Sequence, residues 1–277
     1  MQKIEFKVTQ DMKLTKAISN ELPSFSLFDI KRIIDNKDVK VNNLRAKEDS
    51  LVKTGSVVVV YYQEKEGRDC YTEVYHDDNI LIVNKRAGIE VVSETDRDLI
   101  SIVKKDYTSA IAVHRIDRNT EGLVIFALNK SSEKQLLSAF KTRTGIVKKY
   151  ALKVHGRVDI SKIKRTMYLK KVDSLSKVWI SEIKTSGYEP IITEFDLIEY
   201  IGDYTILEAS LITGKTHQIR AHVAYYGHAI VGDNKYGKDN EKQMCLTANY
   251  LSFKFSAKSE LSYLNDKNFE IVPSWYN

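Results

Sequence analysis

Apolar residues near the start of the chain first recur at the spacing of a helix face and then alternate as in a strand. Leu27, Ile30 and Ile34 fall on one face of a helix. Residues 38–43 alternate and end in two asparagines, which predicts a strand followed by a turn. The β-branched run 57–61 predicts a further strand. The pattern therefore indicates a small α/β unit at the start of the chain.

Strand-like segments dominate the longer remainder of the chain. We expect strands over residues 80–83, 123–128, 150–154, 178–183, 193–197, 204–211 and 246–255. Helix-like segments interrupt them at residues 98–105, 131–141 and 216–226. Because strands and helices do not alternate regularly, an α+β domain with a mixed, mostly antiparallel sheet fits better than a doubly wound sheet.

A polar, glycine-containing segment separates the two parts. Residues 63–69 read QEKEGRD, which is typical of a linker. We therefore predict a small domain over residues 1–62, a linker over 63–73 and a larger domain over 74–277.

Composition narrows the class of protein without deciding it. A hydrophobic fraction of 43% excludes a disordered chain, and a net charge of +6 allows an anionic partner. The first 25 residues mix charges throughout, and no apolar run is long enough to cross a membrane. Cys70 and Cys245 form no CxxC pair and suggest no disulfide framework. These features predict a cytoplasmic protein without a membrane segment.

Motifs for nucleotide cofactors and metals are missing or incomplete. Gly214-Lys215-Thr216 looks like the end of a phosphate-binding loop, but Ala209 stands where that motif needs its first glycine. His217 and His222 are spaced as HxxxxH, unlike the HExxH of zinc enzymes, and no cysteine is nearby. We therefore expect neither a cofactor nor a metal.

Three separated segments concentrate polar residues of the kind that carry chemistry. The first, residues 112–122, reads AVHRIDRNTEG and places Asp117 between Arg115 and Arg118, just before an apolar strand. Its local chemistry alone leaves two interpretations open: a surface loop with weak salt bridges, or a functional loop.

The second and third segments are individually ordinary. Residues 148–154 read KKYALKV, and Tyr150 by itself fits a tyrosine on the face of a sheet. Residues 211–222 read LITGKTHQIRAH, a strand that ends at a glycine turn before a helix. Arg220 lies off the apolar face of that helix, so it can reach a neighbouring loop.

Taken together, the three segments resemble, in order and spacing, the signature blocks of the large-subunit type (RluA family) RNA pseudouridine synthases. In that family an HR-hydrophobic-DR-x-T-x-G loop bears the essential aspartate, which matches Asp117. A K-x-Y strand bears an active-site tyrosine, which matches Tyr150. A TG-basic-THQ-hydrophobic-R-x-H block bears an arginine that pairs with the aspartate, which matches Arg220.

The resemblance implies the pseudouridine-synthase fold and a cofactor-free isomerisation of uridine in structured RNA. It favours ribosomal RNA of the large subunit over transfer RNA, and we expect a monomer. The family also implies that Arg115 helps to hold a flipped nucleotide or fills the space it leaves. Lys215, His217 and Gln218 begin the predicted helix and are further candidates for RNA contacts.

Supporting blocks lie at residues 77–88, 230–237 and 246–251. Two positions depart from the family pattern. Arg86 replaces a usual proline, and Glu121 replaces a usual serine, which would place a second carboxylate near Asp117.

The first domain resembles a small RNA-binding domain first known from a ribosomal small-subunit protein. The likeness covers residues 13–62 and rests on the order of helix, VKVNN strand and LVKTGSVV segment. Residues 1–62 hold eleven Lys and Arg against eight Asp and Glu, a net charge of +3. The resemblance implies that this domain adds RNA affinity.

Two other classes of function stay open. A non-catalytic RNA-binding protein of ribosome assembly could use the same fold, although the aspartate, tyrosine and arginine of the three blocks are all present. A nuclease would show clustered acidic metal ligands, which the sequence lacks, and a glycosylase would release free uracil.

Overall fold

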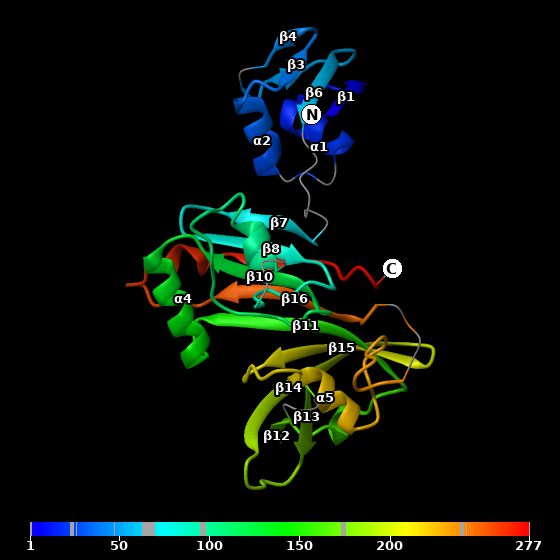
Figure 1. Ribbon diagram of the computed structural model, residues 1–277. Coiled ribbons are helices and arrows are strands. Elements are labelled where there is room, and N and C mark those ends of the chain that lie inside the picture. Colours follow the sequence, from blue (N-terminus) through cyan, green and yellow to red (C-terminus); the bar gives the residue numbers. More distant parts are fainter. Residues whose placement is uncertain are drawn as a thin grey trace. The chain divides into compact units, whose positions relative to one another are not determined.

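The computed structural model describes two compact units, Met1–Thr72 and Glu73–Asn277 (Figure 1). The described residues are 2–22, 25, 27–46, 48–62, 70–94, 98–172, 176–238, 241 and 243–276. The expected linker segment 63–69 lies outside them. The end of the predicted linker is wrong, because strand β7 (Tyr71–His76) begins within it. The Tyr71 side chain is buried, and β7 pairs with the next strand of the larger sheet.

The first unit is a small antiparallel sheet with two helices. Its strands are ordered β1-β6-β3-β4, and a second pair joins β2 to β5. The elements are β1 (Gln2–Lys7), β2 (Met12–Lys13), α1 (Leu14–Glu21), α2 (Leu27–Asp35), β3 (Val39–Val41), β4 (Leu44–Arg45), β5 (Leu51–Val52) and β6 (Val57–Tyr62).

The local sequence explains why these elements form. Ile30 and Ile34 are buried, which confirms the helix face expected for α2. Asn42 and Asn43 both adopt positive φ angles, 48° and 67°, as a tight turn between two strands requires. Helix α1 was not predicted; it buries Leu14 and Ile18 at the spacing of a single helical turn.

The second unit is built on one large mixed sheet, ordered β13-β12-β14-β15-β11-β16-β10-β8-β7. Among the described pairings only β10 with β16 is parallel, so the predicted mixed, mostly antiparallel α+β fold is confirmed. The remaining strands are β8 (Ile80–Lys85), β9 (Ile111–Ala112), β10 (Glu121–Ala127), β11 (Ile146–His155), β12 (Thr166–Val172), β13 (Lys177–Ser181), β14 (Glu189–Ile201), β15 (Tyr204–Leu211), β16 (Leu246–Phe253) and β17 (Asn268–Glu270).

Among the described residues of this unit, three α-helices and two 3₁₀ turns accompany the sheet. They are α3 (Leu99–Val103), α4 (Lys130–Thr142), α5 (Gln218–Tyr225), η2 (Ile160–Lys162) and η4 (Ser262–Leu264). Every strand and helix expected in this part of the chain is present; the strand over 204–211 has the predicted bounds, and the bounds of the others are shifted. Strands β7, β9, β12 and β17 were not predicted, and β12 buries only Met167 and Leu169.

The centre of the sheet is a close joint between β10 and its neighbour β16, next to β11 in Figure 1. Gly122 of β10 has φ +125°, and a Cβ there would overlap the backbone of Ala248 in β16. On the other side of β16, Ala248 and Asn249 together face the single residue Tyr150 of β11, which is a β-bulge. The absence of a side chain at Gly122 and the bulge in β16 therefore bring Tyr150 close to the loop that leads into β10.

We expect Gly122→Ala to lower the free energy of unfolding by about 3 kcal/mol, because it adds both backbone strain and a steric overlap. Gly202→Ala is the matched control: Gly202 also has a positive φ, 58°, but nothing lies within 4 Å of its added Cβ. That control should cost only about 1 kcal/mol. Urea unfolding of both variants measures the difference, and equal losses would contradict the close joint.

Candidate active site

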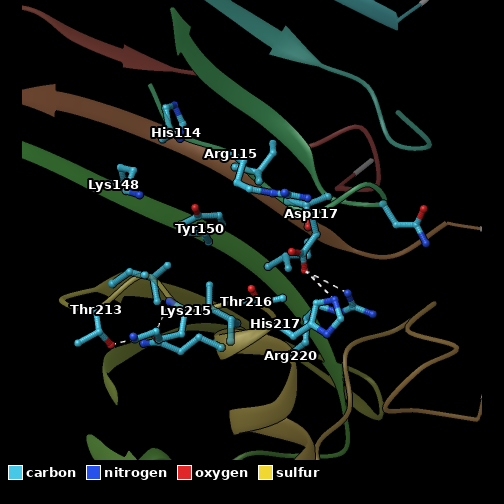
Figure 2. A pocket seen from close by; sticks show the side chains of 18 of the residues that line it. His114, Arg115, Asp117, Lys148, Tyr150, Thr213, Lys215, Thr216, His217 and Arg220 are labelled. Carbon is cyan, nitrogen blue, oxygen red and sulfur yellow. Dashed lines mark hydrogen bonds and ion pairs between the residues drawn. The ribbon is translucent and has the colours of Figure 1, made fainter. Parts of the chain in front are cut away.

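A cleft of about 1040 Å³ opens in the second unit, and its walls come from segments far apart in the sequence. They include the loop before β10, the end of α4, strand β11, the turn before α5 and residues 232–235 (Figure 2). The cleft brings together every site residue expected from the sequence: Arg115, Asp117, Tyr150, Lys215, His217, Gln218 and Arg220.

Arg220 of α5 connects two carboxylates at the base of this cleft. Its Nε and Nη2 each donate a 2.8 Å hydrogen bond to Asp233, and its Nη1 donates a 3.1 Å hydrogen bond to Asp117 Oδ2. Burial acts to lower the pKa of Arg220, but Asp233 and then Asp117 outweigh it, so the pKa is raised. The guanidinium is therefore fixed and charged, and it orients Asp117 through the hydrogen bond to Oδ2.

Asp233 is the partner of Arg220 that sequence analysis missed. Its side chain is buried, and its Oδ1 also accepts hydrogen bonds from the backbone N–H groups of Lys235 and Tyr236. Burial acts to raise the pKa of Asp233, but the hydrogen bonds and charge of Arg220 hold it below its usual value. The IVGDNKYG block was the available signal, but it gave no indication of which residue the carboxylate would meet.

Lys85 anchors the loop that carries Asp117. This lysine is fully buried at the end of β8 and donates to the carbonyl oxygens of Arg86, Ile89 and Arg118 at 2.8–3.0 Å. Gly88 N–H donates to the same Arg118 carbonyl, and Arg118 Nε donates back to the Gly88 carbonyl. The backbone one residue beyond Asp117 is therefore fixed to the turn after β8.

The Asp117 side chain is 24% exposed and faces the cleft. Its Oδ2 is oriented by Arg220, as Figure 2 shows. Its Oδ1 has no hydrogen-bond partner among the described residues. One carboxylate oxygen is thus held in place while the other stays open to a ligand.

Tyr150 lies beside this carboxylate and is almost fully buried on β11. Burial, and then the negative charge of Asp117, raise the pKa of its phenol well above the usual value. The tyrosine therefore stays protonated at neutral pH and presents a neutral ring and a hydroxyl group.

His217 faces Asp117 from the turn before α5. Its φ of 55° is left-handed, so α5 begins at Gln218 and the predicted helix start at residue 216 is wrong. Its Nε2 lies 3.8 Å from Asp117 Oδ2, and its Nδ1 lies 2.9 Å from the Tyr236 hydroxyl. Burial lowers the pKa of His217 despite Asp117, so the imidazole is neutral at pH 7.

Gln218 has a structural role, which corrects the expectation that it contacts RNA. Its buried side-chain amide accepts hydrogen bonds from the Thr213 hydroxyl and Lys215 N–H, and it donates to Ile192 O and Thr193 Oγ1. All its hydrogen-bonding capacity is used in joining the turn to β14.

The other predicted cations keep their side chains near the surface. Lys215 forms an ion pair with Glu189. Arg115 is exposed at the cleft wall two residues before Asp117.

Glu121 does not place a second carboxylate in the cleft. Its Oε1 accepts hydrogen bonds from Thr247 Oγ1 and Ser274 N–H, and its Oε2 accepts from Gln243 Nε2 and Ser274 Oγ. The four donors around it match the capacity of a carboxylate. The side chain therefore joins the C-terminal segment to the start of β10.

Comparison with known proteins connects this geometry to a family. The family model described as RNA pseudouridylate synthase matches residues 79–225, more than half of the chain and most of the residues that line the cleft. The chain belongs to this family. It is therefore an RNA pseudouridine synthase, an isomerase that acts on RNA.

Individual relatives agree with this family membership. An RNA pseudouridine synthase of Mycoplasma capricolum subsp. capricolum is 32% identical, over 97% of this chain and 96% of its own. The ribosomal large subunit pseudouridine synthase C of Vibrio cholerae serotype O1 is 28% identical, over 83% of this chain and 79% of its own. The solved structure of human RNA pseudouridylate synthase domain containing 1 has a TM-score of 0.58 at 25% identity, covering 68% of this chain and 80% of that one.

Two negative observations apply to the described part of the chain. None of its helices has the length and apolar character needed to cross a membrane. Nor do its His, Cys, Asp and Glu residues form a group of three or more that could hold a metal ion.

We expect Asp233→Ala to lower the free energy of unfolding by about 3–5 kcal/mol, because it leaves the Arg220 guanidinium buried without its main partner. Glu133→Ala, which removes the exposed pair with Lys130, should cost less than about 1 kcal/mol. Urea unfolding at pH 7 compares the two. Because the folded-state pKa of Asp233 is depressed, its contribution should persist above pH 4 and disappear as the pH falls further.

Proposed function

We propose that this pseudouridine synthase isomerises uridines in large-subunit ribosomal RNA and that Asp117 is its essential catalytic group. The choice of RNA is supported by the Vibrio cholerae relative, whose name specifies the ribosomal large subunit. The catalytic role of Asp117 is supported by one observation above all. Its carboxylate lines an open cleft and is fixed through Oδ2 by a buried arginine, and Oδ1 has no hydrogen-bond partner among the described residues.

The reaction needs a carboxylate in this state. Uridine becomes pseudouridine when the bond from N1 of uracil to the sugar breaks and a bond from C5 to the same sugar carbon forms. The hydrogen at C5 is lost and N1 gains one, so the product is an isomer of the substrate. A charged carboxylate can act as nucleophile, stabilise positive charge on the sugar or remove the C5 proton.

The neighbouring side chains fit supporting roles. Arg220 orients Asp117 through a charge-assisted hydrogen bond. The protonated Tyr150 offers an aromatic ring for the uracil to contact and a hydroxyl beside the carboxylate. The uridine must leave its stack to reach them, at a cost of about a few kcal/mol, and exposed Arg115 lies where it can hold the flipped nucleotide.

We further propose that the first unit adds RNA affinity without taking part in the chemistry. It carries none of the cleft residues, and its net charge of +3 over residues 1–62 favours contact with phosphates. Lys31, at α2, and Lys37, just after it, are exposed.

The assignment of Asp117 can be tested together with the choice of RNA. Cells lacking the gene should lose pseudouridine at one or a few positions of large-subunit ribosomal RNA, and the wild-type gene should restore them. Asp117→Asn removes the charge and the nucleophile but keeps the shape, so it should restore none, and its rate in vitro should fall by at least about 1000-fold.

The measurements are pseudouridine mapping in ribosomal and transfer RNA, and tritium release from RNA labelled at C5 of uracil. Loss of pseudouridine only from transfer RNA would reject the proposed substrate while leaving the catalytic role intact. Near-normal tritium release by folded Asp117→Asn protein would reject the catalytic role.

For the first unit, we expect the double variant Lys31→Ala/Lys37→Ala to bind RNA several-fold more weakly. Its plot of log affinity against log salt should be less steep by about 1 to 2, while kcat stays unchanged. The control is Lys3→Ala/Lys53→Ala, which removes the same charge from lysines already paired with Glu5 and Asp11. Identical binding by the two double variants would count against a specific RNA surface on this unit.

A further inference from the structure

Lys148 is a cation in the cleft wall to which the reaction as described gives no role. Side chains alternate along a strand, so Lys148 points to the same side of β11 as Tyr150, and Lys149 points to the other. Lys149 has a carboxylate partner, since its Nζ lies 2.6 Å from Glu208 Oε1. Lys148 has none among the described residues, and burial lowers its pKa to about 8.

His114 provides a second donor beside this lysine. Its Nε2 accepts a 3.0 Å hydrogen bond from Ile125 N–H. Burial, and then the charge of Lys148, hold the pKa of His114 well below its usual value, so the ring is neutral. A neutral ring that accepts at Nε2 must carry its proton on Nδ1, and this buried Nδ1 meets no acceptor among the described residues.

Both side chains are held by the same aromatic ring. The His114 ring stacks on Phe140 of α4 with 4.6 Å between centroids, and Lys148 Nζ lies 5.0 Å from the Phe140 centroid. Lys141 and Arg143, from the end of α4, line the same cleft. Lys148, Lys141, Arg143 and the unused donor of His114 therefore gather here, and no carboxylate among the described residues pairs with the three cations, which is the composition of an anion site.

The position of this anion site relative to Asp117 and Tyr150 suggests which anion binds. In Figure 2, Lys148 and His114 lie on one side of Tyr150, and Asp117 and Arg220 lie on the other. A nucleotide whose base contacts Tyr150 next to Asp117 would have its backbone within reach of the end of the cleft where Lys148 and His114 lie. Uracil is neutral, so the anionic part of the substrate is its phosphodiester backbone.

We propose that Lys148, supported by His114, binds a backbone phosphate next to the uridine that reacts. The inference rests on the proposed assignment of the cleft as the active site. Lys148 then serves capture and placement of the flipped nucleotide, whereas Asp117 serves the chemical step.

The experiment compares Lys148→Met with Lys149→Met in the full-length protein. Methionine keeps an unbranched apolar chain against Phe140 and removes only the charge. The substrate is bulk RNA labelled at C5 of uracil, taken from cells that lack the gene, so that the test does not depend on which RNA is modified. Tritium release below saturation gives kcat/KM at several salt concentrations.

We expect Lys148→Met to lower kcat/KM by roughly 10- to 100-fold, mostly through KM. Its plot of log kcat/KM against log salt should be less steep by about 0.7 to 0.9, the value for one lost phosphate contact. Lys148→Arg should recover the salt slope and part of the rate, because it keeps the charge. Lys149→Met should stay within about 2-fold of the wild type, and thermal unfolding should show all three variants folded.

Two results would overturn the inference. A loss in Lys148→Met with an unchanged salt slope would mean that the lysine contacts the base or only supports packing. Equal effects of the two methionine variants would mean that only overall charge matters. The Asp117 assignment is judged separately, from the loss of turnover by Asp117→Asn, so either proposal can fail while the other stands.

Discussion

The candidate active site depends on one buried guanidinium that is shared between two carboxylates. Arg220 makes two hydrogen bonds to Asp233 and one to Asp117. The pair with Asp233 compensates for burying the charge, because an unpaired buried arginine would cost several kcal/mol. The remaining N–H is then available to orient Asp117 without having to support the arginine alone. Asp117 can therefore stay partly exposed and reactive while its partner is rigid.

This arrangement requires loops from distant parts of the chain to meet within a few ångströms. The Asp117 loop is fixed on one side by buried Lys85 and leads into β10 on the other. At the start of β10, Gly122 lets β16 approach closely, and the bulge of β16 faces Tyr150 of β11. The central strands thus set the spacing between the carboxylate and the tyrosine, and Arg220 sets the orientation.

The electrostatics of the cleft separate two tasks along its length. At one end, Asp117 and Asp233 share the Arg220 cation beside a neutral His217. At the other end, Lys148 is a cation without a carboxylate partner among the described residues. A neutral base and an anionic backbone are the two chemically different parts of the RNA substrate. The charge distribution matches that difference, with our proposed reaction at the first end and our proposed phosphate contact at the second.

Much of the fold could be predicted from local patterns, because apolar periodicity reports which face of an element is buried. The α+β class, the strands from β8 to β16 other than β9 and β12, and the helices α2 to α5 followed from it. Elements with few apolar residues were missed: α1 is short, and β12 carries only two buried side chains. Helix α5 starts later than predicted, because His217 adopts a left-handed conformation that periodicity does not register.

For the site, the sequence by itself determined which segments matter, since the order and spacing of three motifs identified Asp117, Tyr150 and Arg220. It could not determine what each polar side chain contacts. No pattern in the sequence indicated that Asp233 is the partner of Arg220. Gln218 was expected to contact RNA, but its side chain is hydrogen-bonded within the protein. Glu121 contacts the C-terminal segment. These hydrogen bonds join residues 13, 26 and 153 positions apart, and they depend on how the strands and loops pack. Only the tertiary structure decided them, because strand order is set by packing of the whole sheet and not by any local pattern.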